Sequence, residues 1–255
     1  MALFSDGPIS TVDDLVQHDS SLISVASTEG IDVTAKLTLA HTEMGIELDA
    51  LFGREASIYS SGSGGALLDS AHLAVSPSLK SWHIFRTLEL VYRDAYFNLL
   101  NERYKGKWSE YQSLARWAMG KFIEIGAGLI NDPLSQPGEP MISLESSSQA
   151  GGTLYVSVTV LNSAGEESTP SVAIEIAVPD GSVSLLQLGA RPSNAISWNI
   201  YGGVSPSKMT LQTSVPLPTT ASWEYVLPGS ISGRGPGMGQ TWNFIRDLPR
   251  RIMRG

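Results

Sequence analysis

Four histidines are the side chains in this sequence best suited to acid–base or metal chemistry: His18, His41, His72 and His83. Metal sites on helices place histidines at fixed short spacings, as in H-E-x-x-H, and no pair here has such a spacing. His41 has Glu43 and Glu47 nearby, but on a helix these two glutamates share a face that His41 does not. We therefore interpret the histidines as solvated helix residues and predict no metal site.

The sequence also lacks the usual motifs for nucleophilic catalysis and phosphate binding. There is no cysteine, no serine in a G-x-S-x-G motif, and no G-K-[ST] after the glycine-rich segment at 62–67. A second glycine-rich segment, GRGPGMG at 233–239, is better explained as a loop that bends past a neighbouring backbone. Paired carboxylates for glycoside hydrolysis are recognised by their spacing in space, and nothing in the sequence favours them. We predict a protein that is not an enzyme, with no catalytic residues and no cofactor.

Residues 1–132 are predicted to form an α-helical domain. Thr11, followed by acidic residues, resembles the start of a short helix. A longer helix is predicted over 31–52, with Asp32 as its N-cap and Gly53 as its stop. Its apolar residues recur at helical spacing on one stripe: Val33, Leu37, Ala40, Met44, Leu48 and Leu51.

Two further helices are predicted in this half. Ser76 as cap and Pro77 at the first helical position open a helix that runs to about residue 104. The segment 105–107, Lys-Gly-Lys, is expected to break it, and another helix follows over 109–125. The loop between them is short, so these two helices are expected to lie antiparallel.

Beyond a proline-rich linker at 133–140, the sequence pattern changes from helical to alternating. Residues 141–240 contain six short segments with strand character, separated by turn signals, which is typical of a β-sandwich. Two segments alternate strictly and should each place four apolar side chains on one face: Leu154, Val156, Val158 and Val160, then Val172, Ile174, Ile176 and Val178. The predicted fold class is α+β, an N-terminal antiparallel α-helical bundle followed by a C-terminal antiparallel β-sandwich.

The stretch ISWNIYGG at 196–203 reads as a core strand of this sandwich. Alternation places Trp198 and Ile200 on one face and Asn199 and Tyr201 on the other. A central tryptophan often fills the core of such folds, so we predict that Trp198 is buried.

Charge is distributed unevenly along the chain. The net charge of −8 lies entirely in residues 1–55, whereas the last ten residues carry +3. Such polarity suits head-to-tail contact between copies or docking on a partner of opposite charge. A solvated first helix followed by an ordinary basic terminus is the simpler alternative. No apolar run reaches the length of about 20 residues that a membrane helix needs, so no membrane association is predicted.

Residues 241–255 are predicted to be a basic, aromatic tail outside both domains. Aromatic and arginine side chains are the commonest anchors of protein interfaces. The candidate partner-binding residues are Trp242, Phe244, Arg246, Arg250, Arg251 and Arg254.

Two parts of the sequence together resemble structural proteins of tailed bacteriophages. The stretch STEGIDVTAKLTLAHTEMGIELDALF, at 27–52, resembles the first helices of head–tail connector (adaptor or neck) proteins. The later stretches NSAGEESTPS, ISWNIYGGVSPSKMTLQ, PGSISGRGPGMGQ and RRIMRG resemble a fibronectin- or Ig-like β module found in such proteins. Many adaptors consist of the helical part only, which leaves the role of the β module open.

This resemblance implies a structural protein at the head–tail junction of a virion, made in the host cytoplasm. Its implied partners are the portal protein, neighbouring copies in a ring of twelve, and the next neck or tail component. DNA would pass through the ring without sequence-specific binding, and acidic side chains facing the channel would repel its phosphates. The candidates for these acids are Glu43, Glu47 and Asp49. Deletion of 241–255 is then expected to spare the melting of both domains and to abolish incorporation into the assembly.

The sequence leaves two alternatives to the connector function. A tail-associated receptor- or carbohydrate-binding protein would present an exposed aromatic, such as Trp223 or Trp242, to a glycan. A hydrolase with an unrecognised site is the third reading, and a screen against glycan and peptide substrates would test it.

Overall fold

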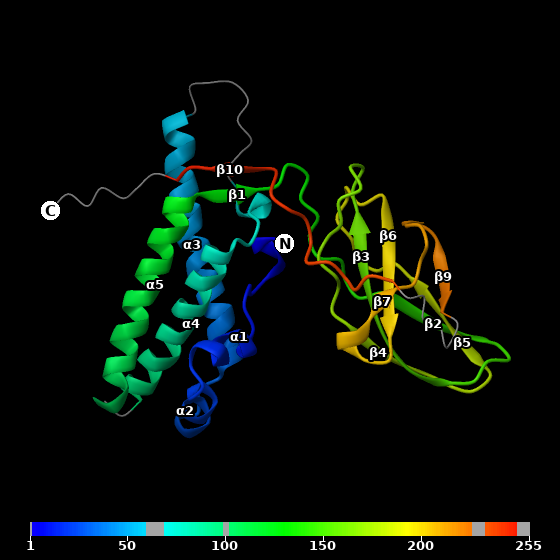
Figure 1. Cartoon of the computed structure of the whole chain (residues 1–255), viewed down its shortest axis with the longest axis horizontal. Helices are drawn as coiled ribbons and strands as arrows, with labels where there is room; N and C mark the ends of the chain where they lie inside the picture. The colour runs from blue at the N-terminus through cyan, green and yellow to red at the C-terminus, as the bar shows by residue number, and fades with distance from the viewer. Residues whose placement is uncertain (1, 60–68, 99–101, 226–232, 249–255) are drawn as a thin grey trace. The chain divides into compact units, whose positions relative to one another are not determined.

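The computed structural model describes residues 2–59, 69–98, 102–225 and 233–248. The chain divides into two compact units, described separately below (Figure 1). The helical unit comprises Phe4–Asn131 and Trp242–Gly255, and the sheet unit comprises Met1–Leu3 and Asp132–Thr241. Helices precede an antiparallel sheet region along the chain, so the predicted α+β class is confirmed.

The helical unit contains five α-helices and three short 3-10 turns within the described residues. The α-helices are α1 (Val12–His18), α2 (Leu22–Glu29), α3 (Val33–Tyr59), α4 (Pro77–Phe97) and α5 (Lys105–Ile125), and the 3-10 turns are η1 (Phe4–Asp6), η2 (Ser70–His72) and η3 (Glu102–Tyr104).

Helix starts follow the capping residues in the sequence. The Thr11 hydroxyl accepts a hydrogen bond from the Asp14 amide, and the Asp14 carboxylate accepts one from the Thr11 amide, which makes a capping box at the start of α1. Asp32 caps α3 by accepting from the Ala35 amide at 3.0 Å. Ser76 caps α4, with a proline in its first turn.

The ends of the helices differ from the prediction more than their starts do. Gly53 does not stop α3, which continues to Tyr59, because one interior glycine costs a helix only about 1 kcal/mol. α4 ends at Phe97, earlier than predicted. The segment 105–107 does not break a helix but forms the first turn of α5, where backbone amides lack helical partners in any case.

α4 is the central helix of this unit. Twelve of its 21 residues are buried, against four of 21 in α5. The predicted apolar stripe of α3 is confirmed, since all six of its residues are buried. Side chains from α3, α4 and α5 join those of α1 and α2 in one hydrophobic cluster. α4 therefore contributes more buried side chains than α5, and it is the helix on which the unit packs.

The sheet unit contains two antiparallel sheets. One has the strand order β2-β5-β9 and the other β4-β3-β6-β7, with β8 also paired to β6. The strands are β2 (Met141–Ser146), β3 (Gly152–Leu161), β4 (Ile174–Val178), β5 (Ser182–Gln187), β6 (Ser197–Gly203), β7 (Thr210–Leu211), β8 (Leu217–Pro218) and β9 (Ser222–Tyr225).

One apolar cluster joins the two sheets. The four predicted inward residues of β3 are fully buried and pack with Trp198 and Ile200 of β6 and with Leu186 of β5. The predictions for Trp198 and for the two faces of its strand are confirmed. Val172 was expected to belong to the apolar face of the next strand, but it is exposed because β4 begins only at Ile174.

A small two-stranded sheet closes the helical unit. After α5 the chain forms β1 (Ala127–Leu129), and after the sheet unit it returns as β10 (Phe244–Arg246) to pair with β1 (Figure 1). Between α5 and β1, Gly126 has a φ of +95°, and a Cβ there would lie 2.7 Å from the Arg246 carbonyl oxygen. Leu248, just beyond β10, is buried in the helical core.

The predicted tail at 241–255 therefore differs from the structure for residues 242–248. These residues pack as part of the helical unit rather than projecting from it. Deletion of 241–255 was expected to spare the melting of both domains. We now expect it to destabilise the helical unit, because it removes β10 and the core side chain of Leu248.

We predict that Leu248→Ala lowers the free energy of unfolding of the helical unit by about 2–4 kcal/mol, because it leaves a cavity in the core. Urea unfolding followed by circular dichroism measures the loss. Ile245→Ala is the matched control, since Ile245 lies in the same segment but is 51% exposed. Equal losses in the two variants would contradict the assignment of β10 and Leu248 to the helical core.

Candidate functional site

The three acids proposed to face a channel all lie on α3, but the structure does not bring them together. Glu43 and Glu47 are one helical turn apart and line the same groove. Asp49 is exposed, and two residues beyond Glu47 it points to the other side of the helix. Glu43 is also ion-paired with Arg86. α3 therefore does not present them as one continuous acidic stripe.

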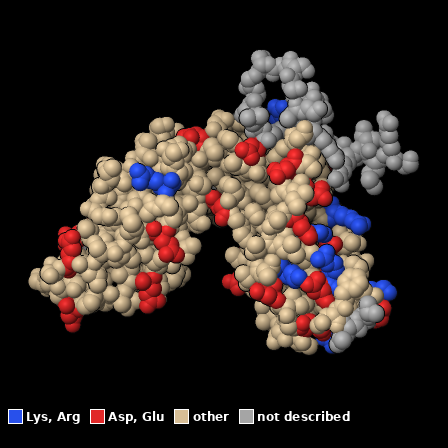
Figure 2. Space-filling model, turned by 180° about the vertical axis from the view of Figure 1, so that it is seen from behind, with Lys and Arg blue, Asp and Glu red and all other residues tan. Residues whose placement is uncertain are grey.

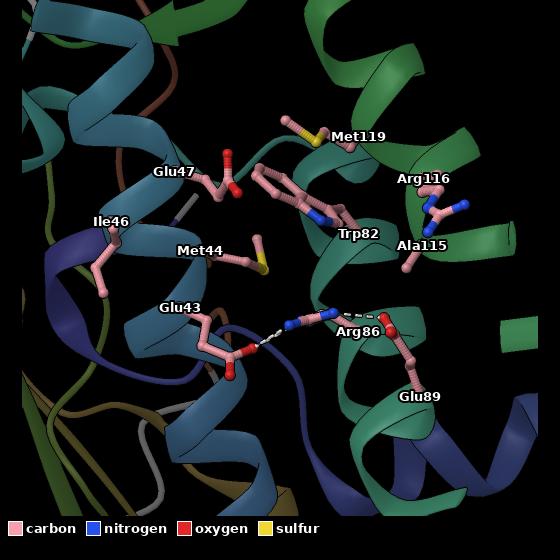
Figure 3. A pocket seen from close by; sticks show the side chains of 10 residues that line it. All are labelled: Glu43, Met44, Ile46, Glu47, Trp82, Arg86, Glu89, Ala115, Arg116 and Met119. Carbon is pink, nitrogen blue, oxygen red and sulfur yellow. Dashed lines mark hydrogen bonds and ion pairs between the residues drawn. The ribbon is translucent and has the colours of Figure 1, made fainter. Parts of the chain in front are cut away.

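The groove that contains Glu43 and Glu47 lies over α4, between α3 and α5. Figure 3 shows α4 between the other two helices, with side chains from all three turned toward the space. Its apolar lining comes from Met44 of α3, Trp82 of α4 and Met119 of α5, and it has a volume of about 390 Å³. Ile46 on the α3 rim is 67% exposed. Met44 and Trp82 are almost fully buried, so most of the apolar surface of the groove comes from Met119 and Ile46.

Arg86 fixes the charge at one end of the groove. Its Nε donates to the Glu43 carboxylate at 2.8 Å, and its Nη1 donates to Glu89 at 2.6 Å (Figure 3). Burial alone would lower the pKa of Arg86, but the hydrogen bonds that it donates to Glu43 and Glu89 outweigh this effect and raise the pKa. Two carboxylates share one guanidinium, so this triad keeps a net negative charge.

The residues proposed as partner anchors at the C-terminus divide into two groups. Trp242 packs its ring against Gly128, where a Cβ would lie 3.1 Å from it, and Phe244 packs against the helical core. Arg246 is half-buried in β10. Trp242 and Phe244 therefore help to hold the chain end on its own helical unit. The remaining candidates lie outside the described residues: Arg250, Arg251 and Arg254.

A buried carboxylate that the sequence analysis did not single out connects four helices. Asp19 lies at the C-terminal end of α1, and its side chain is 3% exposed. One carboxylate oxygen accepts from the Ser21 amide and hydroxyl. The other accepts from three donors on α4 and α5, at 2.7–2.9 Å: Tyr92, Lys107 and Tyr111. Burial alone would raise the pKa of the Asp19 carboxyl, but these hydrogen bonds outweigh it and hold the pKa well below its usual range.

His83 is buried, so its interpretation as a solvated helix residue is wrong. Its Nε2 lies 3.1 Å from the Leu37 carbonyl oxygen, which can only accept, so Nε2 carries the proton. Nδ1 then accepts from the Ser10 hydroxyl at 2.6 Å. Burial lowers the pKa of His83 to about 4. A neutral histidine with both nitrogens bonded in this way links α4 to α3 and to the segment before α1.

The sheet unit has a half-buried acid, Glu167, that bonds several strands and loops. Glu167 accepts hydrogen bonds from Asn199 and Tyr201 on the outer face of β6, and from Thr159 on β3. Burial alone would raise the pKa of Glu167, but its hydrogen bonds, including one from Arg234, lower it. The segment GRGPGMG is thereby held on the sheet through Arg234.

The glycines of this segment explain its path. A Cβ on Gly233 would lie 2.8 Å from the Leu211 carbonyl oxygen, so the backbone passes β7 more closely than any other residue allows. This agrees with the prediction of a loop that bends past a neighbouring backbone.

Asp19, Glu167 and His83 each form hydrogen bonds with other groups of the protein. Across the described residues, no group of three or more His, Asp or Glu side chains is placed to hold a metal ion. None of the helices in the described part of the chain combines the length and the apolar character that crossing a membrane requires.

The sequence contained one signal for the Asp19 cluster. An acid at the C-terminal end of a helix opposes the helix dipole and needs compensation from elsewhere. The compensating side chains lie 73 to 92 residues away, at a distance that no local pattern reveals. No local sequence pattern predicts the groove, because side chains from three separate helices form it.

We predict that Asp19→Asn lowers the free energy of unfolding by about 2–4 kcal/mol, because the variant leaves buried hydroxyl donors and Lys107 without their charged acceptor. Urea unfolding at neutral pH is the measurement. Asp13→Asn, an exposed acid on the same helix, should change stability by less than about 1 kcal/mol. If Asp19→Asn were no more harmful than this control, the cluster would not be holding the helices together.

We also predict that stability falls as the pH is lowered from about 6.5 toward 4. Over this range the unfolded chain binds a proton at His83 that the folded protein does not, so protonation favours unfolding. The full effect is at most about 3 kcal/mol. Stability measured against pH should show a shallower fall in His83→Gln than in the wild type. Identical slopes in the two proteins would rule out His83 as the source.

Comparison with known proteins was made both by family and by sequence. No model of a protein family and no curated protein matches the chain. The argument for a function therefore depends on the groove, the charges and the sequence resemblance described above.

Proposed function

We propose that this protein is a structural connector of a tailed-bacteriophage virion. In this proposal it assembles as a ring beneath the portal, joins the capsid to the tail and forms part of the DNA conduit. Its partners are the portal protein, neighbouring copies of itself and the next neck or tail component. The proposal concerns binding surfaces, and it assigns no catalytic step to any residue.

The observation that carries the proposal is the charge polarity of the helical unit. The acidic excess of residues 1–55 and the basic excess of the last ten residues belong to the same compact unit. Figure 2 shows acidic and basic side chains densely intermixed on one face of this unit and sparser on the sheet unit. A chain whose two ends carry opposite net charge is suited to head-to-tail contacts between identical copies in a ring.

Within this proposal, the assignment of acidic side chains to the DNA channel changes. Glu43 is neutralised in part by Arg86, and Glu47 lines the groove, so both are better suited to a protein partner. Asp49 is exposed on a different side of α3 and stays a candidate for the channel. Repulsion between such an acid and phosphates would leave DNA free to slide.

The alternative function, receptor or carbohydrate binding, has less support from the described aromatics. A sugar platform needs several exposed and coplanar rings, whereas Trp198 and Tyr201 are buried and Trp223 packs against the core of the sheet unit. Trp242 is partly exposed, but its ring covers Gly128. These four rings therefore do not form a platform of several exposed, coplanar rings.

Immunogold electron microscopy of phage particles from the source culture, with antibody to this chain, tests the proposal. We expect label at the head–tail junction. Label at the distal tail would instead support receptor binding, and alanine variants of Trp223 and Trp242 would then be compared for glycan binding. Particles without label at any site would overturn the virion assignment.

A further inference from the structure

Helix α3 carries a second row of uncharged side chains on its exposed side. This outer row has spacings of three and four residues and consists of Ala35, Leu39, Thr42, Ile46, Ala50 and Gly53. Each member follows a residue of the buried stripe by two positions, which is about 200° around the helix. All of them are exposed, Ile46 by 67%, and Figure 3 shows the Ile46 side chain turned away from α4. The outer row is therefore not used by the core of the helical unit.

Helix α5 has an outer row of a different kind. It consists of Ser109, Ser113, Trp117 and Gly120, again at spacings of three and four residues. These residues are exposed and lie on the side of α5 opposite to its buried residues. Trp117 is 56% exposed, and the rest of the row is small. A large exposed aromatic side chain among small residues is typical of an anchor in a protein interface.

Two glycines in these rows leave open space on the surface of the unit. Gly53 and Gly120 lie inside α3 and α5, where glycine is less favourable than alanine. No described atom lies within 4 Å of a Cβ built on either residue, so packing within the described chain does not require a glycine there. A glycine at such a place lets another backbone approach closely.

The helices α3 and α5 lie on either side of α4 and run in the same direction (Figure 3). Ion pairs and ring contacts show that α4 is antiparallel to both: Lys36–Asp94 and Glu43–Arg86 with α3, and Tyr92–Tyr111 and Trp82–Phe122 with α5. Because each outer row lies opposite to the buried side of its helix, the two rows face away from α4 on opposite flanks. The α5 row of one copy can therefore meet the α3 row of the next copy with the helices parallel.

The two rows are complementary in spacing and size. Leu39 and Ile46 are seven residues apart, and so are Ser113 and Gly120. When parallel helices place Leu39 level with Ser113, they also place Ile46 level with Gly120. Each large side chain of α3 then lies opposite a small residue of α5, which is the arrangement that close packing of two helices needs.

The same alignment also accommodates the large residue of α5. Trp117 comes level with Thr42, one of the smaller members of the α3 row. Arg116, next to Trp117, lines the groove side of α5 and has no ion pair with another described residue. Glu43 lines the groove side of α3, in the triad that keeps a net negative charge. Arg116 and Glu43 of the next copy then lie at one level on the same side of the contact, where their charges are complementary.

We infer that the outer row of α5 in one copy packs on the outer row of α3 in a neighbouring copy. The inference rests on the ring of the proposed function and names the contact that builds it. Two different surfaces of the chain meet, so the contact repeats from copy to copy in one direction. In a closed ring every copy uses both rows, and neither Trp117 nor Ile46 stays exposed.

Disulfide trapping tests the contact in the full-length chain, which contains no native cysteine. One variant carries both Leu39→Cys and Ser113→Cys, on two helices that α4 separates. Under mild oxidation of the concentrated protein, we expect a ladder of disulfide-linked dimers, trimers and larger products on a non-reducing gel. The matched control carries Thr34→Cys with Ser113→Cys, because Thr34 is an exposed residue of α3 about 140° around the helix from Leu39. The contact pair should give about tenfold more product, since binding holds its thiols at high effective concentration.

Three outcomes of the trapping would overturn the inference. The first is a yield no greater than that of the control, with both thiols shown to react with a maleimide. The second is a disulfide that closes within one chain. The third is a dimer formed by Leu39→Cys alone at the yield of the contact pair, since two α3 rows would then meet each other.

Filling the space above Gly120 separates the contact from the fold. Gly120→Leu should leave the melting temperature equal or higher, because leucine favours a helix more than glycine and the space is open within the described chain. The added side chain takes the place of Ile46 of the neighbouring copy, so the yield of the contact pair should fall several-fold. An unchanged yield would overturn the assigned alignment.

The trapping and the gold labelling can fail separately. Gold label at the head–tail junction without a disulfide ladder would reject this contact and keep the connector function. A ladder with no label on any particle would keep the contact between copies and reject the virion assignment.

Discussion

The Asp19 carboxylate lies where the first two helices meet α4 and α5, and its charge has to be compensated there because it is removed from water. Hydroxyls of Tyr92 and Tyr111 and the ammonium of Lys107 provide that compensation from two helices. The two tyrosine rings also stack, with centroids 5.4 Å apart. Short helices such as α1 and α2 have little stability alone, so this cluster is what fixes them on the longer helices.

The same unit is completed only when the chain returns from the sheet unit. β10 supplies the second strand for β1, and Leu248 fills a place in the helical core. The sheet unit is therefore an insertion in the sequence of the helical unit, between Asn131 and Trp242. The helical unit is therefore complete only after residues 242–248 have been added to it.

The packing of the three long helices also produces the groove over α4. Twelve of the 21 residues of α4 are buried, and Trp82 and Arg86 of this helix lie between side chains of α3 and α5. Trp82 is almost fully buried there, whereas Ile46 and Arg116 at the edges of the groove are exposed.

The sequence by itself determined the α+β class, the caps at Thr11, Asp32 and Ser76, the buried stripe of α3 and the two faces of β6, because each of these depends on residues close together in the chain. Only the tertiary structure decided what depends on distant partners. The burial of His83 requires Ser10 and the Leu37 carbonyl, and the pairing of β10 with β1 joins segments more than 110 residues apart. The groove also depends on distant residues. Its lining side chains come from α3, α4 and α5, and they lie next to one another only when the three helices pack.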